Sequence, residues 1–335
     1  MYDKSARRPP AISAGTSMLD AARSVCRAVP SSRDPVRVEP QTAPDGSLSD
    51  DERAALKAMR SQVDAEWSTS VWMEAARVEA TAHMDDFTLM RFVKSRPGSS
   101  RAAVDMFREA MTYRSTERIN DLFRELHPLA PQPWSPRQRV RAAHYFGGFG
   151  GFDREGAPYF VLRVGQADVG GMSRAPAVLE LMMQADAVNM ETIFRSVRLC
   201  SAATGRFVRV RIIVDLQGFG MSSLRHAGII KRVMQVGPNV FPEGASKVFL
   251  VNAPRIFAAA WTVIAPWLPQ RSRDKCSVFS VNATPAALAE VIESDQLPGF
   301  LGGTMAEADT LVARAERIPE DAAVALLTAE PVPIE

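Results

Sequence analysis

The sequence has few cysteines and histidines and almost no net charge. Its 335 residues include three cysteines and four histidines, and its formal net charge is +2. Cys26, Cys200 and Cys276 lie far apart, so their spacing supports neither a disulfide framework nor a zinc site. A charge this small gives no support for nucleic-acid binding. We therefore expect a cytoplasmic protein that binds no nucleic acid.

Long hydrophobic runs and catalytic motifs are also missing. No uninterrupted apolar run approaches the ~18 residues of a membrane-spanning helix. The longest apolar stretch, residues 256–268, is interrupted by Thr262 and Pro266. The sequence contains no G-x-S-x-G, G-x-x-x-x-G-K-[ST] or H-E-x-x-H motif, and its histidines have no metal-ligand spacing. We expect no catalytic residues, no metal and no enzymatic cofactor.

Composition and periodicity divide the chain into four segments. Residues 1–49 are rich in Pro, Ser, Ala and Arg without a period, which predicts a disordered linker. Residues 50–130 have helical periodicity and form a predicted helical module, with helices opened by Asp85 or Asp86 and by Ser99 or Ser100. Residues 131–304 form the main domain, and residues 305–335 an acidic helix and tail.

The main domain has the pattern of an α/β fold with a mostly parallel sheet. A hairpin turn is expected at residues 153–156, and a long helix over residues 175–204. Residues 207–281 then read strand, turn, helix, strand, helix, strand, and strands joined by a helical crossover are parallel. The clustered glycines at 147–151 predict a bulge or a close backbone approach.

An apolar pocket is predicted between this sheet and the helix at residues 257–268. Side chains alternate along a strand, so one face carries Val210, Ile212 and Val214, and Phe249 and Val251 share a face on the next strand. The helix is apolar nearly all round, which is typical of a buried helix or of one that meets an apolar ligand or a membrane. Ordinary core packing is the alternative interpretation.

A nucleotide site is a competing interpretation of the turn after the central strand. Gly218, Gly220 and Ser223 form G-x-G-x-x-S between a strand and a helix, close to a dinucleotide-binding fingerprint. The next strand ends in VNAP, without the acid that would bind ribose. Asp215 ends the central strand, and we expect its carboxylate to accept backbone N–H groups of the turn.

Six stretches between about Asp85 and Gly303, which follow one another along the chain in the order typical of the family, resemble the CRAL-TRIO family of Sec-fourteen-like lipid carriers. Four lie in the main domain: VDLQGFGMSS, FPEGASKVFLVNAP, FAAAWTVIAPWL and QLPGFLGG. FDREGAPYFVLRVG resembles the first hairpin of the family, and DDFTLMRFVKSRPGSSRAAVDMFREAMTYRS its helical N-terminal module. The resemblance implies a monomeric lipid-transfer protein, transiently associated with membranes, that holds one lipid under a mobile gate helix without a cofactor.

Carried over to this sequence, the resemblance implies two sets of site residues. The expected lipid pocket consists of Val210, Ile212, Val214, Phe219, Phe249, Val251, Phe257, Trp261, Ile264 and Trp267. The expected head-group and membrane-facing basic set consists of Arg91, Lys94 and Arg96.

Departures from the family pattern bear on which lipid is bound. Pro97 stands where a second basic residue is usual, Val233 or Met234 where a glutamate is expected, and Ala265 where the gate carries lysine. These changes argue against phosphatidylinositol. In the resembled family, members that hold phosphatidylcholine carry small hydroxyl residues at the positions of Val210 and Ile212, and this sequence lacks those hydroxyl groups. A sterol or tocopherol-like lipid is therefore as consistent with the pattern as a phospholipid. A lipid-sensing scaffold without transfer activity and a nucleotide-dependent enzyme are the alternative functions.

Overall fold

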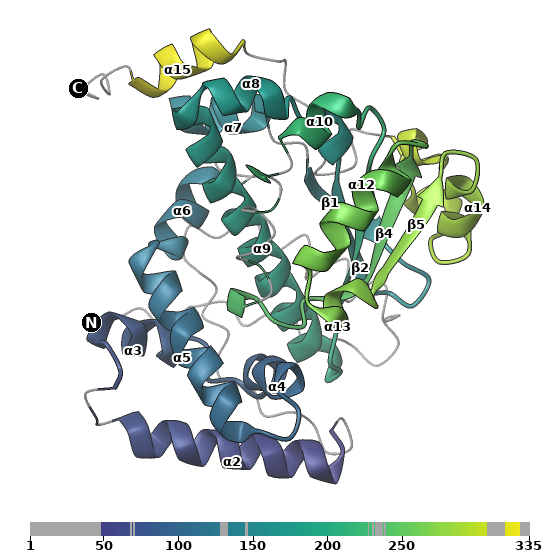
Figure 1. Cartoon of the computed structure of the whole chain (residues 1–335). Helices are drawn as coiled ribbons and strands as arrows, with labels where there is room; N and C mark the ends of the chain where they lie inside the picture. The colour runs from purple at the N-terminus through teal and green to yellow at the C-terminus, as the bar shows by residue number, and fades with distance from the viewer. Residues whose placement is uncertain are drawn as a thin grey trace.

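The fold is known from a computed structural model of the chain (Figure 1). It describes residues 48–67, 69, 71–127, 133–144, 147–226, 228, 229, 231, 237, 239–306 and 319–328. The predicted linker at 1–49 lies almost wholly outside the described residues, as do Val233, Met234 and most of the acidic tail. One tail helix is described, α15 (Glu320–Thr328).

Five helices form the N-terminal part of the structure. They are α2 (Asp50–Trp67), α3 (Glu74–Thr81), α4 (Asp86–Ser95), α5 (Ser100–Thr116) and α6 (Ile119–Leu126). The capping residues expected for α4 and α5 are in place, because Asp85 accepts a hydrogen bond from the Thr88 amide and Ser99 accepts one from the Ala102 amide.

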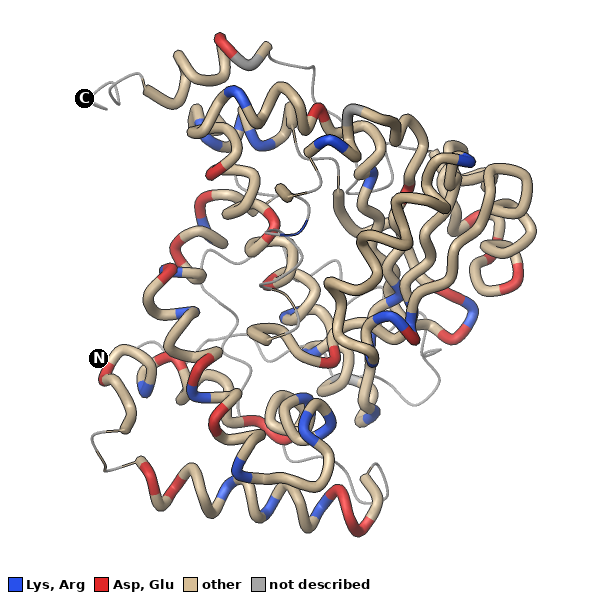
Figure 2. Tube along the Cα trace, in the orientation of Figure 1, with Lys and Arg blue, Asp and Glu red and all other residues tan. Residues whose placement is uncertain are grey.

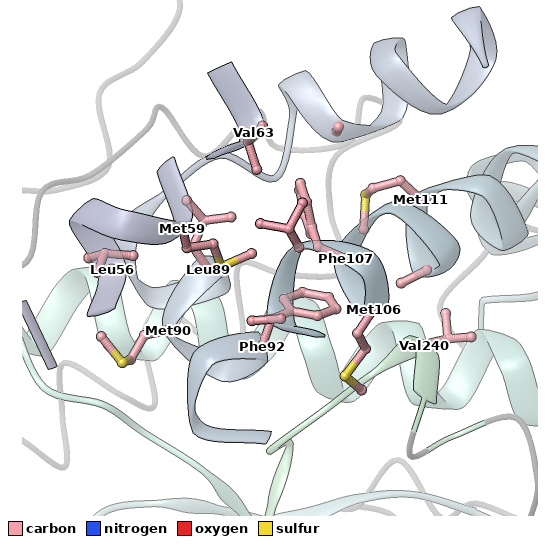
Figure 3. Packing of buried hydrophobic residues seen from close by; sticks show 14 of the residues in the cluster. Leu56, Met59, Val63, Leu89, Met90, Phe92, Met106, Phe107, Met111 and Val240 are labelled. Atoms are coloured by element: carbon pink, nitrogen blue, oxygen red, sulfur yellow. The ribbon is translucent and has the colours of Figure 1, made fainter. Parts of the chain in front are cut away.

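The core of these helices is built from apolar side chains of α2, α4 and α5 (Figure 3). Met59, Leu89 and Phe107 are fully buried there, and the Phe92 and Phe107 rings meet edge to face with centroids 5.1 Å apart. Phe194 and Phe241 of the following domain belong to the same cluster. The helices therefore share their core with the sheet domain.

The sheet has five strands in the order β1-β2-β3-β4-β5. Their bounds are β1 (Gly147–Phe152), β2 (Pro158–Leu162), β3 (Val210–Asp215), β4 (Ala245–Ala253) and β5 (Cys276–Ser280). β1 and β2 pair antiparallel, and all later neighbours are parallel. The predicted α/β fold with a mostly parallel sheet is confirmed.

The predicted hairpin joins β1 and β2, and it has a bulge at Gly150. The turn is held by Asp153, whose carboxylate accepts hydrogen bonds from the amides of Glu155 and Ala157 at 2.9 and 2.8 Å. The strand register shifts between Phe149 and Gly151. A side chain at Gly150 would place its Cβ 2.1 Å from the Tyr159 ring, so the bulge needs glycine at this position.

Helices cover both faces of the sheet. The remaining elements are α7 (Pro136–His144), η1 (Val164–Gln166), α8 (Val169–Arg174), α9 (Pro176–Thr204), α10 (Met221–Arg225), α12 (Phe257–Ile264), η2 (Ala265–Trp267), α13 (Gln270–Arg273), α14 (Thr284–Ala289), η3 (Ser294–Gln296) and η4 (Gly299–Leu301). In Figure 1, α12 lies in front of the sheet, α9 lies to its left and α14 lies at the right-hand edge of the sheet.

Charge is unevenly distributed over these elements. Figure 2 shows acidic and basic residues interspersed along α2, α5 and α9, whereas α12 is drawn without a charged residue. Among the described helices, none has the length and hydrophobicity needed to cross a bilayer. Nor do the described His, Cys, Asp and Glu residues form a group of three that could hold a metal ion.

Candidate functional site

A cavity of about 620 Å³ lies between the sheet, α9 and α12. Its floor is formed by Ile212 and Val214 of β3 and by Val248 and Leu250 of β4. These four residues are in register as neighbours, Ile212 beside Val248 and Val214 beside Leu250, so they face the same side of the sheet. The floor is therefore entirely apolar.

Six of the ten predicted pocket residues line this cavity. They are Ile212, Val214, Phe219, Phe257, Trp261 and Ile264. The Phe257 ring meets Phe219 edge to face at 5.3 Å and stacks on Trp261 at 6.0 Å. These aromatic contacts connect α12 to the turn after β3.

Phe249 and Val251 do not line the cavity, and their predicted placement is wrong. Both pack on the opposite face of the sheet, in a cluster with Ile213, Leu288 and Leu297. The reason is the parity of β4, because Phe249 is in register with Ile213 rather than with Ile212. Every residue from Val248 to Val251 is apolar, so the sequence does not reveal which pair faces the cavity.

Val210 and Trp267 lie close to the cavity but are not among its lining residues. Val210 is fully buried at the start of β3, against Ile193 and Val197 of α9. Trp267 is partly buried at the end of the α12 segment, and the Lys231 ammonium lies 5.8 Å from the centre of its ring. Val210 is therefore a core residue, and Trp267 covers the apolar cluster under α12.

The wall opposite α12 is a stripe of α9 that the sequence did not assign to the site. Five apolar side chains of α9 line the cavity: Leu179, Met182, Met190, Ile193 and Phe194. Together with Asp186, which also lines the cavity, each of these positions lies three or four residues from another of the set, which places them on one face of the helix. This spacing was visible in the sequence, but a methionine-rich stripe is equally typical of a helix that packs in a core.

α12 is a short helix that separates the cavity from solvent on its outer side. Its inner side chains Phe257, Ala260 and Ile264 are buried, whereas Ala258 and Val263 are exposed on its outer side. Val263 is 50% exposed, although it is a large apolar residue. Pro254 precedes the helix, and Pro266 lies in η2, which follows α12 directly. Neither proline has a backbone N–H to donate to a regular helical hydrogen bond.

Arg91 is buried in the protein, which contradicts its predicted role in binding a head group. It is completely buried, and its guanidinium donates to the carbonyls of Glu243 and Val208, both at 2.8 Å. Burial lowers the pKa of Arg91 to about 9, so the group stays charged at neutral pH. Its physical role is to fasten α4 to the segments that precede β3 and β4.

Lys94 and Arg96 differ in their access to the cavity. The Lys94 ammonium bonds to the Glu52 carboxylate of α2 and lies over the Phe207 ring, and it is not among the lining residues. Arg96 is exposed and lines the cavity. Of the three predicted basic residues, the structure brings Arg96 alone to the cavity.

Two basic residues that follow α12 also line the cavity and were missed from the sequence. They are Arg271 of α13 and Lys275, which precedes β5. Both approach the carboxylate of Glu243, at 3.4 and 3.1 Å. Burial acts to raise the pKa of Glu243, but Lys275, Arg271 and Arg209 together hold it below its usual range.

The carboxyl ends of β2, β3 and β4 carry a second polar group. The Asp215 carboxylate is fully buried, accepts hydrogen bonds from the Gln217 amide at 3.0 Å and the Asn252 side chain at 2.9 Å, and lies 3.5 Å from the Arg163 guanidinium. The expected structural role of Asp215 agrees with these contacts, although its backbone donor is Gln217 rather than a residue at 218–220.

The glycine turn after β3 has a packing function. Gly218 has a φ of 95°, and a Cβ there would lie 2.7 Å from the Gly165 carbonyl oxygen. The helix that follows, α10, has five residues. Two chain segments thus cross at Gly218 in close contact, which explains the glycine without a bound phosphate.

Comparison with protein families and known proteins gives one family match. Residues 142–303 match the family model of the CRAL/TRIO domain. This range begins in α7 and ends after η4, so it includes the whole sheet, α9 and α12.

Several curated proteins are similar to the chain beyond this domain. Sec14 cytosolic factor of Schizosaccharomyces pombe is 25% identical over 261 residues, which cover 77% of this chain and 84% of that protein. Protein real-time of Anopheles gambiae is 27% identical over 226 residues, 65% of this chain and 31% of its own. Phosphatidylinositol/phosphatidylcholine transfer protein SFH9 of Arabidopsis thaliana is 25% identical over 225 residues, 66% of this chain and 37% of its own.

The shared segment is only part of some of these relatives. The chain spans about a third of the length of the Protein real-time sequences of Anopheles gambiae, Aedes aegypti and Drosophila melanogaster, at 31%, 35% and 32%. Among solved structures, the crystal structure of Sfh5 is 12% identical, with a TM-score of 0.48, and the match covers 72% of this chain and 83% of that one.

Proposed function

Residues 142–303 of this chain are a CRAL/TRIO domain, and we propose that the protein holds one lipid in the cavity beneath α12 and exchanges it between membranes. Proteins of this family bind and transfer lipids. In this proposal the bound lipid is the one ligand, and no cofactor or catalytic step is involved. The protein acts as a cytoplasmic monomer that contacts membranes transiently.

The observation that carries the proposal is the apolar cavity of about 620 Å³. Its volume falls in the range of ~300–1,000 Å³ that is typical of small-molecule sites. Moving an acyl chain from water into such a site contributes about 0.8 kcal/mol per methylene group. A chain of lipid size therefore supplies ample affinity, while its transfer from a bilayer exchanges one apolar medium for another.

We propose α12 with η2, residues 257–267, as the gate. α12 contains no charged residue, its inner side is apolar, and its outer side exposes Ala258, Ala259 and Val263 with Thr262. The outer side, which includes the exposed Val263, can enter a membrane interface. The inner side then moves away from the sheet and opens the cavity. The prolines at 254 and 266 give the gate two points at which it can bend.

In the same proposal the remaining segments have supporting roles. Residues 50–130 form the helical module that holds α9 in place, and residues 131–304 are the lipid-binding domain. The proposal needs no defined structure in residues 1–49, and it places the acidic segment 305–335 outside the site. Trp267, at the end of the gate, and Arg96 would meet the membrane surface.

A transfer assay between donor and acceptor vesicles tests the proposal. Val248→Trp places a large side chain on the cavity floor and should reduce the transfer of a fluorescently labelled lipid by about tenfold or more, because a bulky side chain occupies the volume that the ligand needs. Val278→Trp is the matched control, since Val278 is 42% exposed on β5 and is not among the lining residues.

The expected result is loss of transfer in Val248→Trp, with transfer retained in Val278→Trp. Circular dichroism and urea denaturation of both variants establish that they are folded. Equal transfer by the two variants would show that the lipid does not occupy this cavity, and a wild-type protein that transfers no lipid would remove the proposal altogether.

A further inference from the structure

The end of the cavity nearest α8 is closed by apolar side chains. Val169 and Met172 of α8 line the cavity there, together with Leu179 and Met182 of α9. α8 leads directly into α9, since Ala175 alone separates the two helices. The two methionines are the longest of the four lining side chains, and each is 6% exposed. They therefore close this end of the cavity from two successive helices.

This end is suited to the apolar part of a lipid rather than to a polar group. The four side chains offer no hydrogen-bonding group except the methionine thioether, which is a weak acceptor. The first polar side chain on this face of α9 is Asp186, one helical turn beyond Met182. His144 and Arg163 also line the cavity, and Arg163 faces the Asp215 carboxylate at 3.5 Å. A head group placed against the methionines would lose its hydrogen bonds to water without replacement, so the end of an apolar chain is favoured there.

The C-terminal helix α15 covers the outer side of the same wall. Val178, Leu181, Met172 and Met182 belong to one apolar cluster, to which α15 contributes the fully buried Ala323. Three partly buried apolar residues of α15 pack against this cluster. In Figure 1, α15 lies beside α7 and α8 at the top of the view. The two methionines are thus shared between the cavity lining and the cluster beneath α15.

The position of this end wall depends on α15. A methionine side chain is flexible and fills irregular gaps, so it does not fix a wall by itself. Because protein interiors are close-packed, the cluster beneath α15 restricts outward movement of Met172 and Met182. The match to the CRAL/TRIO model ends at residue 303, so α15 lies outside the matched domain.

We propose that the apolar chain of the bound lipid ends against Met172 and Met182, and that α15 holds this end wall in place and so sets the longest chain that the protein accepts. This inference rests on the proposed lipid-binding function and specifies which lipids the cavity selects. A chain that is too long meets packed side chains backed by a helix, and overpacking is unfavourable. A chain that is too short leaves a gap and loses contacts with the wall.

A competition between acyl chains of different length tests this inference. The protein is incubated with vesicles that contain phosphatidylcholines and the matching diacylglycerols in equal amounts, with monounsaturated chains from myristoleoyl to erucoyl. Bound lipid is extracted, and its chain composition is compared with that of the vesicles by mass spectrometry. We expect the wild-type protein to be enriched in one range of chain lengths and to exclude the longest chains. Chain length is read within each head-group class, so the result does not depend on which head group is bound.

Substitutions of Met182 should move the preferred chain length in opposite directions. Met182→Ala extends the space and should raise the ratio of long to short bound chains by about tenfold, the contribution of roughly two further methylene groups. Met182→Phe shortens the space and should lower the same ratio. Met183→Ala is the matched control, because this neighbouring methionine is partly buried and is not among the lining residues. A general loss of stability would not move the ratio in two directions.

A pair of substitutions on α15 tests its part in the end wall. Ala323→Glu places a charge in the buried cluster and should detach α15, so the ratio of long to short chains should rise as it does in Met182→Ala. Ala322→Glu is the matched control, because Ala322 is exposed on the same helix. Circular dichroism and urea denaturation establish that all variants are folded. An unchanged ratio in Ala323→Glu would overturn the role of α15.

The outcomes separate the inference from the function on which it rests. If the wild type and both Met182 variants bind the same chain lengths, or if the bound chains simply match those of the vesicles, the end wall is overturned while lipid binding stands. Uptake of no lipid from any of these vesicles would overturn the proposed function itself.

Discussion

The two helices that enclose the cavity, α9 and α12, are held in place by different kinds of contact. α9 is fixed to the N-terminal helices by buried ion pairs: the Arg114 guanidinium donates to both carboxylate oxygens of Glu191 at 2.6 and 2.9 Å, and Arg198 donates to Asp85 at 2.7 Å. α12 lies against the sheet through apolar contacts of Phe257, Ala260 and Ile264.

This difference indicates which wall moves. Separating a buried ion pair costs free energy, because each charge is left without its partner. Moving an apolar side chain from the protein interior into a membrane costs little, because both surroundings are apolar. Burial opposes the ionisation of Glu191, but the charges of Arg114 and Arg195 hold its pKa far below its usual range. In the proposed mechanism, α9 is therefore the fixed wall, and α12 is the wall that a membrane displaces.

The largest expected effect concerns the fixed wall. Glu191→Gln leaves the completely buried Arg114 with incomplete compensation, and it should lower the free energy of unfolding by about 3–5 kcal/mol. Urea denaturation measures this change. Asp121→Asn is the control, because its partner Arg118 is 76% exposed and such surface pairs contribute under about 1 kcal/mol. Similar losses in the two variants would show that the buried pair is not what fixes α9.

The two faces of the sheet should respond differently to truncation. Phe249→Ala removes a ring that stacks on Phe279 at 5.7 Å in the closed core, and it should cost about 3–5 kcal/mol of stability without changing lipid uptake per folded molecule. Ile212→Ala enlarges a space that is already open, so we expect a smaller stability loss and altered uptake. Denaturation and lipid extraction are measured on both variants, and the opposite pattern would exchange the roles of the two faces.

Substitutions on the outer surface of α12 test its proposed role as the membrane-facing, moving wall. Val263→Glu removes the burial of one valine in the membrane, a loss of about 1.5–3 kcal/mol, and should weaken vesicle binding by about tenfold or more. Vesicle co-sedimentation measures this binding. Val281→Glu is the matched control, because Val281 is 58% exposed and lies outside α12. If both substitutions weaken binding equally, α12 is not the membrane-facing element.

The smallest expected effect is a pH dependence of stability that arises from buried histidines outside α12. Burial, together with the charges of Arg141 and Arg195, lowers the pKa of His127 from 6.5 to about 3. Between these two pH values His127 is protonated in the unfolded chain and neutral in the folded protein. Stability should therefore fall as pH drops below 6.5, by about 1.4 kcal/mol per unit for this group.

A second buried histidine contributes to the same pH dependence. His83, also buried, has its pKa lowered mainly by burial and titrates in the same sense. His127→Gln should reduce the difference between the free energies of unfolding measured by denaturation at pH 7.5 and pH 5.5, because the variant lacks this titrating group. A slope that is unchanged by the substitution would contradict the assignment to His127.

Periodicity predicted much of the fold, because side-chain spacing and caps are local properties. The Asp85 and Ser99 caps, the hairpin and the long helix α9 all follow from neighbouring residues, and so does the alternation that brings Ile212 and Val214 to the cavity. Strand parity in β4 was not predictable, because Val248 to Val251 are apolar on both sides.

The basic residues Arg96 and Arg271, which line the cavity, come from distant segments of the chain. Arg91 and Arg96 are close in the sequence and both basic, yet one is completely buried against Glu243 and Val208 while the other is exposed at the cavity. Arg271 lies near Arg96 because the chain turns back after α12. The Arg271 guanidinium donates a hydrogen bond to the carbonyl of Lys94, 177 residues away in the sequence. Helical spacing holds no information about such contacts.

A photo-crosslinking experiment locates the lipid within the molecule. A lipid with a diazirine on its acyl chain is loaded from vesicles, activated by light, and mapped by mass spectrometry of the digested protein. We expect labels on the lining residues of α9, β3, β4 and α12, such as Met190, Ile212, Val248 and Trp261. Labels on the opposite face of the sheet, at Phe249, Leu288 or Leu297, or no label at all in the lining, would contradict a lipid held between α9 and α12.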